Sequence, residues 1–146
     1  MQRAQVLVFV ALVLPMVLLP AAAFAVDAAA AESAQAILEQ SAASAAESAA
    51  QQIDRTALRS GAGLALDQAE AESVAREVVA AQDPNARVVR VNVNGLDVTV
   101  EASASLQLPL NFLGAPAVAL HASATARLAP GYDSPSSFLP FSVRTF

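Results

Sequence analysis

The chain begins with a long run of apolar residues that carries no charge. Between Arg3 and Asp27 lie 23 uncharged residues, 4–26, most of which are Val, Leu, Ala and Phe. As a helix they would span about 35 Å, which exceeds the roughly 30 Å core of a bilayer. Arg3 precedes the run, whereas Asp27 and Glu32 follow it. The pattern therefore predicts a transmembrane helix with a cytoplasmic N-terminus and an extracytoplasmic C-terminal part.

The same segment also resembles a secretory signal peptide. Ala23-Phe24-Ala25 has the A-x-A form of a cleavage site, and Pro20 precedes it. Cleavage after Ala25 would secrete a protein that begins at Val26. A retained anchor is favoured because one arginine is a weak start for a signal peptide and because strong helix formers continue past Ala25. A buried core helix of a soluble protein is a third interpretation.

Residues 28–60 contain no Gly or Pro and predict a helix that continues from the anchor. Ala and Ser fill most positions, so the helix has little apolar area to bury. It is either an exposed stalk or a helix packed closely in an assembly, because small side chains let backbones approach. The Gly61-Ala62-Gly63 segment ends it. A second helix is expected over 64–82, where apolar positions form a stripe, and Asp83-Pro84 ends it.

The periodicity then changes from helical to alternating. Residues 87–94 read RVVRVNVN, and the runs 96–108 and 117–128 alternate in the same way. The Asn94-Gly95 dipeptide predicts a tight hairpin turn. A two-residue turn there pairs Val91 with Val98 and Val89 with Val100, so that apolar residues face apolar residues. Residues 109–116 form a loop before the third strand.

These elements predict an α+β fold. Its order is an N-terminal transmembrane helix that continues into an Ala-rich helix, a second short helix, and a three-stranded antiparallel β-meander whose apolar face a helix covers. We divide the chain into four segments: an anchor (1–27), an Ala/Ser-rich helical stalk with its Gly break (28–63), a helix plus sheet (64–130), and a tail (131–146). The tail is rich in Ser and Pro and contains Phe138, Phe141 and Phe146. It is expected to dock on its own sheet or on a partner.

Composition excludes several classes of function. The chain has no cysteine, which excludes disulfides, thiol nucleophiles and Cys-based metal sites. A single histidine excludes a His-rich metal cluster. The net charge of −5 and the absence of a basic run argue against nucleic acid as a partner.

Candidate chemical groups are few and scattered. His121 falls on the polar side of the third strand, and the acidic residues of the second helix resemble a solvated face (Glu70, Glu72, Glu77). The serines at 33, 41, 44 and 48 follow helical spacing, not the pattern of a nucleophile motif. The segment 133–137 has Pro135 where a D-x-S-x-S metal motif needs Ser. We therefore expect no catalytic, cofactor-binding or metal-binding residues, and a protein that is not an enzyme.

The N-terminal segment resembles that of the TadE/TadG-like proteins of bacterial tight-adherence (Flp) pilus systems. The resemblance rests on Arg3-Ala4-Gln5-Val6-Leu7-Val8, on Leu12-Val13-Leu14-Pro15 and on Ala25-Val26-Asp27. In that family the segment typically reads R-G-Q, then an apolar run with L-P, then A-V-D, so Ala4 departs from the usual Gly. No acidic residue precedes Asp27, which argues against processing by a prepilin peptidase.

The resemblance implies a structural or assembly component, similar to a minor pilin, in the cell envelope. Its implied partners are the membrane bilayer and other pilus or secretion-system subunits, further copies of this chain included. The alternative from a different class is a secreted or envelope-exposed, non-catalytic binding module released by cleavage after Ala25.

Overall fold

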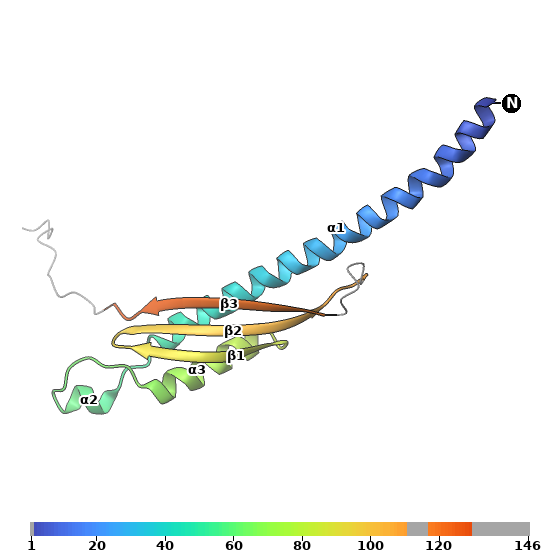
Figure 1. Cartoon of the computed structure of the whole chain (residues 1–146). Helices are drawn as coiled ribbons and strands as arrows, with labels where there is room; N and C mark the ends of the chain where they lie inside the picture. Colours follow the sequence, from blue (N-terminus) through green and yellow to red (C-terminus); the bar gives the residue numbers. More distant parts are fainter. Residues whose placement is uncertain (1, 111–116, 130–146) are drawn as a thin grey trace, which may run out of the picture.

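The computed structural model of the chain describes residues 2–110 and 117–129, with side chains from residue 9 onward. Its elements follow the order α1 (Gln2–Ala49), α2 (Arg55–Arg59), α3 (Gln68–Gln82), β1 (Ala86–Asn94), β2 (Asp97–Gln107) and β3 (Ala117–Arg127). The N-terminal part of α1 projects from a unit in which helices cover one face of a sheet (Figure 1). The α+β fold is therefore confirmed. The tail at 131–146 and its phenylalanines lie outside the described residues.

Helix α1 runs without a break from Gln2 to Ala49 and contains both Pro15 and Pro20. Its Ala- and Leu-rich composition has a high helix propensity, which explains its length. The expectation that this helix continues to Ser60 is wrong. It ends at Ala49, and the chain then leaves the helix direction to form an isolated β-bridge between Ile53 and Leu66.

Two aspartates decide where the next helices begin. The Asp54 carboxylate accepts hydrogen bonds from the backbone N–H groups of Thr56 and Ala57 and so caps the one-turn helix α2. Asp67 accepts in the same way from Ala69 and Glu70, at 3.0 and 3.1 Å. Helix α3 therefore begins at Gln68 rather than at residue 64, and it ends at Gln82 as predicted.

The sheet is the predicted antiparallel meander, with the order β1-β2-β3. The predicted hairpin register is wrong, because the two-residue turn lies one residue further along the chain. Val91 lies opposite Val100, not Val98, and Asn94 lies opposite Asp97. The central turn residues are thus Gly95 and Leu96, and Gly95 has the positive φ of 64° that a tight hairpin turn requires at its first central position.

A β-bulge in β1 corrects a second expectation. The register shifts between Val88 and Arg90, so Val88 lies opposite Ala102 and the intervening Val89 has no partner position. Val89 is 59% exposed and does not join the buried face on which the alternating pattern placed it. The bulge lies where two adjacent valines, Val88 and Val89, interrupt the alternation of apolar and polar residues, and it lets the alternation resume at Arg90.

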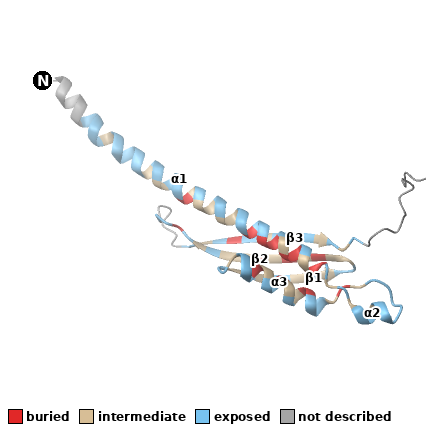
Figure 2. Ribbon diagram, turned by 180° about the vertical axis from the view of Figure 1, so that it is seen from behind, coloured by how far each residue is buried: buried red, intermediate tan, exposed pale blue. Residues whose placement is uncertain are grey.

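The core lies between the apolar face of the sheet and one face of the second half of α1 (Figure 2). One buried cluster joins Leu38 and Ala42 of α1 to Ala102 and Leu120 of the sheet. A second cluster joins the end of α1 and helix α3 to β2, and its buried members are Ala45, Ala46, Ala49, Ala50, Leu66, Ala71, Ala75, Val79, Val98 and Val100. The Ala-rich helix is therefore closely packed, but against its own sheet. It is not a stalk that stands clear of the rest of the chain.

Candidate functional site

The first half of α1 is the most distinctive surface of the described chain. From Phe9 onward the helix is long and apolar enough to cross a membrane, and its most apolar stretch is not buried against the rest of the protein. Large apolar side chains are exposed all around it: Phe9, Leu12, Leu14, Met16, Val17, Leu18, Leu19, Phe24 and Val26. A contiguous apolar surface of this size requires a cover other than water.

Two of the three interpretations of this segment agree with its exposure. Both a membrane span and a signal sequence are long apolar helices near the N-terminus, and neither needs to be buried inside the folded unit. The third interpretation, a helix buried in the core of a soluble protein, is wrong for the described chain. No residue from 9 to 26 is buried in it.

Asp27 marks the boundary between the two halves of α1. It is the first charged residue after the apolar run, yet it is only 1% exposed. Its Oδ1 atom accepts a hydrogen bond of 3.0 Å from the backbone N–H of Leu110, which follows β2. In the sequence, Asp27 is recognisable only as the end of the apolar run, and this contact is not predicted. Its burial could have been inferred from its spacing from Leu38. Eleven residues are about three helical turns, so both side chains lie on the same face of the helix.

The predicted candidate groups do not come together in the structure. His121 is exposed on the outer face of the sheet, and it is its backbone carbonyl that accepts a hydrogen bond from Gln35 of α1, at 3.0 Å. A shallow depression of about 280 Å³ lies beside it and also contains Glu101. Within residues 2–110 and 117–129, no three His, Cys, Asp or Glu side chains are grouped so that they could hold a metal ion.

The helical candidates have structural partners. Glu72 forms an exposed ion pair with Arg76 one turn later on α3. Ser41 is buried, and its hydroxyl donates a hydrogen bond of 2.8 Å to the carbonyl oxygen of Ile37. These contacts are typical of a helix surface and a helix interior, and they do not activate a nucleophile.

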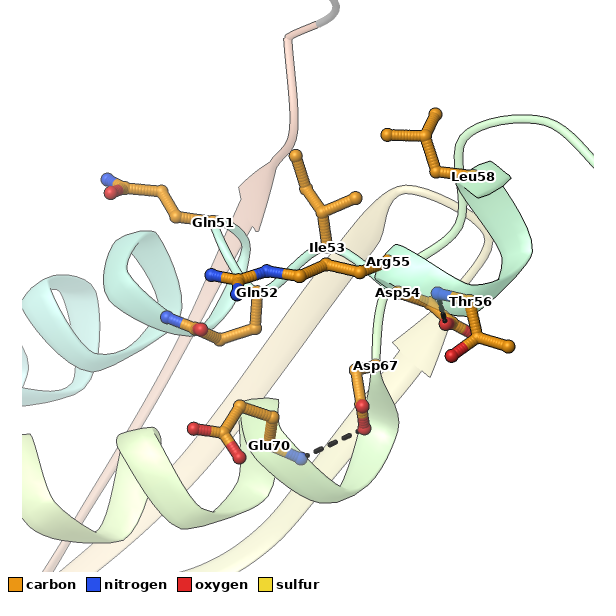
Figure 3. Close-up of a pocket in the computed structure, with 9 residues that line it drawn as sticks. All are labelled: Gln51, Gln52, Ile53, Asp54, Arg55, Thr56, Leu58, Asp67 and Glu70. Atoms are coloured by element: carbon orange, nitrogen blue, oxygen red, sulfur yellow. Dashed lines mark hydrogen bonds between the residues drawn. The ribbon is translucent and has the colours of Figure 1, made fainter. Parts of the chain in front are cut away.

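A larger cleft of about 560 Å³ is lined by the segment that follows α1, by α2 and by the start of α3 (Figure 3). Two of its carboxylates, Asp54 and Asp67, already cap helices. In the close-up, Ile53 and Leu58 point away from Glu70, so the lining does not converge on one point. The cleft thus lies at a junction of elements, and its two aspartates serve to begin helices α2 and α3.

Comparison with protein-family models, with curated proteins and with solved structures found no match to this chain. Its own residues and fold, together with the N-terminal resemblance, are thus the basis for a functional proposal.

Proposed function

We propose that the chain is a single-pass membrane protein that serves as a structural or assembly component, similar to a minor pilin, of a tight-adherence pilus or secretion system. One observation carries this proposal. A single unbroken helix, α1, has an exposed apolar first half and a second half that forms the core of the folded unit. In this arrangement the folded unit is extracytoplasmic and the N-terminus is cytoplasmic, as the charges of Arg3 and Asp27 favour.

The mechanism of such a component is helix packing. An anchor gives all subunits one orientation and a high local concentration in the bilayer, so weak contacts between helices suffice to align them. The face of α1 opposite the sheet remains exposed and supplies a surface for neighbours, with Ala36, Glu39, Gln40, Ala43 and Glu47. The resemblance at Arg3–Pro15 and Ala25–Asp27 supports the pilus context.

A second candidate is a secreted binding module released after Ala25. One observation favours it. All buried residues of the described chain lie at Asp27 or beyond, so the core loses nothing when residues 1–25 are removed. The two candidates thus share one folded unit and differ in whether the apolar helix is retained.

The mature N-terminus separates the two candidates. The protein is purified from membrane and soluble fractions, and its N-terminal peptide is determined by mass spectrometry. A start at residue 1 or 2 in the membrane fraction supports the anchor. A start at Val26 in the soluble fraction contradicts it and supports the secreted module.

The assembly role is tested by replacing the anchor. Residues 1–25 are exchanged for a cleavable foreign signal peptide, export and folding are verified, and adherence is scored in a strain that lacks the native protein. Loss of adherence, with rescue by the native segment, supports anchored assembly. Full adherence from the soluble version rejects it.

A further inference from the structure

The end of the sheet is fastened to α1 at the point where the apolar run stops. The hydrogen bond from the Leu110 N–H to Asp27 joins the segment after β2 to the helix. Leu108, two residues earlier, is 7% exposed, so the chain that leads out of β2 is itself packed against the protein. This end of the sheet therefore has a fixed height along α1.

The sheet then runs alongside α1 for the rest of the helix (Figures 1 and 2). The segment of α1 from Asp27 to Ala49 is about 33 Å long at 1.5 Å per residue. Strand β2, with 11 residues, is about 37 Å long at 3.4 Å per residue. Leu38 shares a buried cluster with Ala102 halfway along, and Ala49 shares one with Val98 at the far end. Leu110 and the turn at Gly95 thus lie at opposite ends of the unit.

The two ends differ in charge. Near Asp27, the strand ends 106–110 and 117–120 contain no charged residue, and Asp27 itself is buried. The charged residues of the neighbouring elements lie further along α1, at Glu32, and after α3, where Asp83 shares a depression with Leu106. Three large apolar side chains are exposed there: Phe24 at 50%, Val26 at 49% and Leu110 at 54%. The far end carries Asp97 and Arg127, together with the charged residues of α2 and its flanks.

We propose that the end formed by Phe24, Val26 and Leu110, here called the basal end, docks on the lipid surface at the boundary between headgroups and acyl chains. This inference rests on the proposed anchor. When the uncharged run 4–26 spans the bilayer, Asp27 reaches the membrane surface, and the Asp27–Leu110 hydrogen bond brings Leu110 to the same depth. Exposed apolar side chains are what this boundary accommodates, and the charged Glu32 lies about 7.5 Å further along α1, on the aqueous side. Asp27 is buried, so its carboxylate does not face the lipid surface.

The absence of tryptophan from the chain makes a clean test possible. Leu110→Trp introduces a single tryptophan at the basal end, whose fluorescence is excited selectively at long wavelength, where Tyr and Phe do not absorb. Leu58→Trp is the matched control, because Leu58 is also 54% exposed but lies on α2 at the far end. Each full-length variant is reconstituted into phosphatidylcholine vesicles with and without lipids brominated near the headgroup end of their acyl chains.

We expect L110W fluorescence to be quenched by the brominated lipids and its emission to shift to shorter wavelength, whereas L58W fluorescence does not change. Adding Asp27→Ala to L110W should reduce the quenching, because it removes the acceptor that holds Leu110 at this height. Adding Asp27→Asn instead retains a side-chain oxygen and should preserve the quenching.

The outcomes separate this inference from the anchor itself. If L110W stays with the vesicles but is not quenched, the lipid contact is overturned and the anchor stands. If the protein does not stay with the vesicles, the anchor fails and the inference fails with it. Equal quenching of L110W and L58W, or of L110W with and without D27A, would overturn the docking of the basal end or the role of Asp27 in it.

Discussion

Thr99 of β2 and Thr125 of β3 lie directly opposite each other, and their hydroxyl oxygens are 2.8 Å apart on the outer face of the sheet. One residue earlier, the Val98 side chain points to the opposite face and is fully buried under the helices. Neighbouring residues of one strand thus experience water on one side and a dry core on the other.

The two faces should respond differently to the same substitution. Val98→Asp places a carboxylate among apolar side chains and should destabilise the fold by several kcal/mol, because a buried charge without a partner is strongly unfavourable. Thr99→Asp loses one exposed hydroxyl contact and should cost about 1 kcal/mol or less. Urea unfolding of the full chain in detergent micelles, followed by circular dichroism, measures both. Equal losses would mean that the two faces are misassigned.

Small side chains on one face of α1 should be needed for its close approach to the sheet. Ala45 is fully buried where α1 packs with α3 and the sheet, so Ala45→Leu should cost about 1–3 kcal/mol through overpacking. Ala43→Leu makes the same change on the exposed face of the same helix and should shift the free energy of unfolding by less than about 0.5 kcal/mol. The pair is compared by urea unfolding. A cost for A43L as large as that for A45L would contradict the observed helix orientation.

Much of the fold could be predicted from the sequence because alternation and helix propensity are local properties. The strands, their order and the end of α3 at Asp83-Pro84 all followed from such patterns. The hairpin register did not. Shifting the turn from Asn94-Gly95 to Gly95-Leu96 still sets valine opposite valine, so the apolar pattern does not distinguish the two registers. The adjacent pair Val88 and Val89 was the sign of a bulge.

The ends of the helices were missed for a different reason. In an Ala-rich segment, propensity alone gives no stop signal, and tertiary contacts decide where the helix ends. The bridge between Ile53 and Leu66 is such a contact. The capping aspartates were visible in the sequence, since Asp54 and Asp67 each precede the first residue of a helix. The role of Asp27 required the third dimension, because its partner at Leu110 is 83 residues away.

The left-handed conformation at the hairpin turn can be tested at Gly95. Its φ of 64° lies in the left-handed region, and an added Cβ would have no atom within 4 Å. Gly95→Ala should therefore cost about 1 kcal/mol through backbone strain and not through a steric clash. Gly95→Asn should cost less, because Asn tolerates this region better. Thermal unfolding compares the two variants, and an alanine variant as stable as the native chain would place the turn elsewhere.

The cap of α3 gives a further prediction. Asp67→Ala leaves the N–H groups of Ala69 and Glu70 without their acceptor and should cost about 1 kcal/mol. Asp67→Asn keeps a side-chain oxygen that can accept these hydrogen bonds, so it should lower the free energy of unfolding by only a few tenths of a kcal/mol. Urea unfolding measures the difference. If D67N is as destabilised as D67A, the hydrogen bonds to this side chain are not what starts the helix.

The continuity of α1 also couples the rotation of its apolar half to the orientation of the sheet. The sheet packs against the same helix that forms the apolar segment. The direction in which the outer face of the sheet points is therefore set by the rotation of the apolar segment about the helix axis. Each residue of an α-helix turns by about 100° and rises by about 1.5 Å. One alanine inserted between Ala25 and Val26 would therefore rotate the outer face of the sheet, with Thr99 and Thr125, by more than a quarter turn about the helix axis relative to residues 9–25. The distance of the sheet from those residues along the axis would change by only about 1.5 Å.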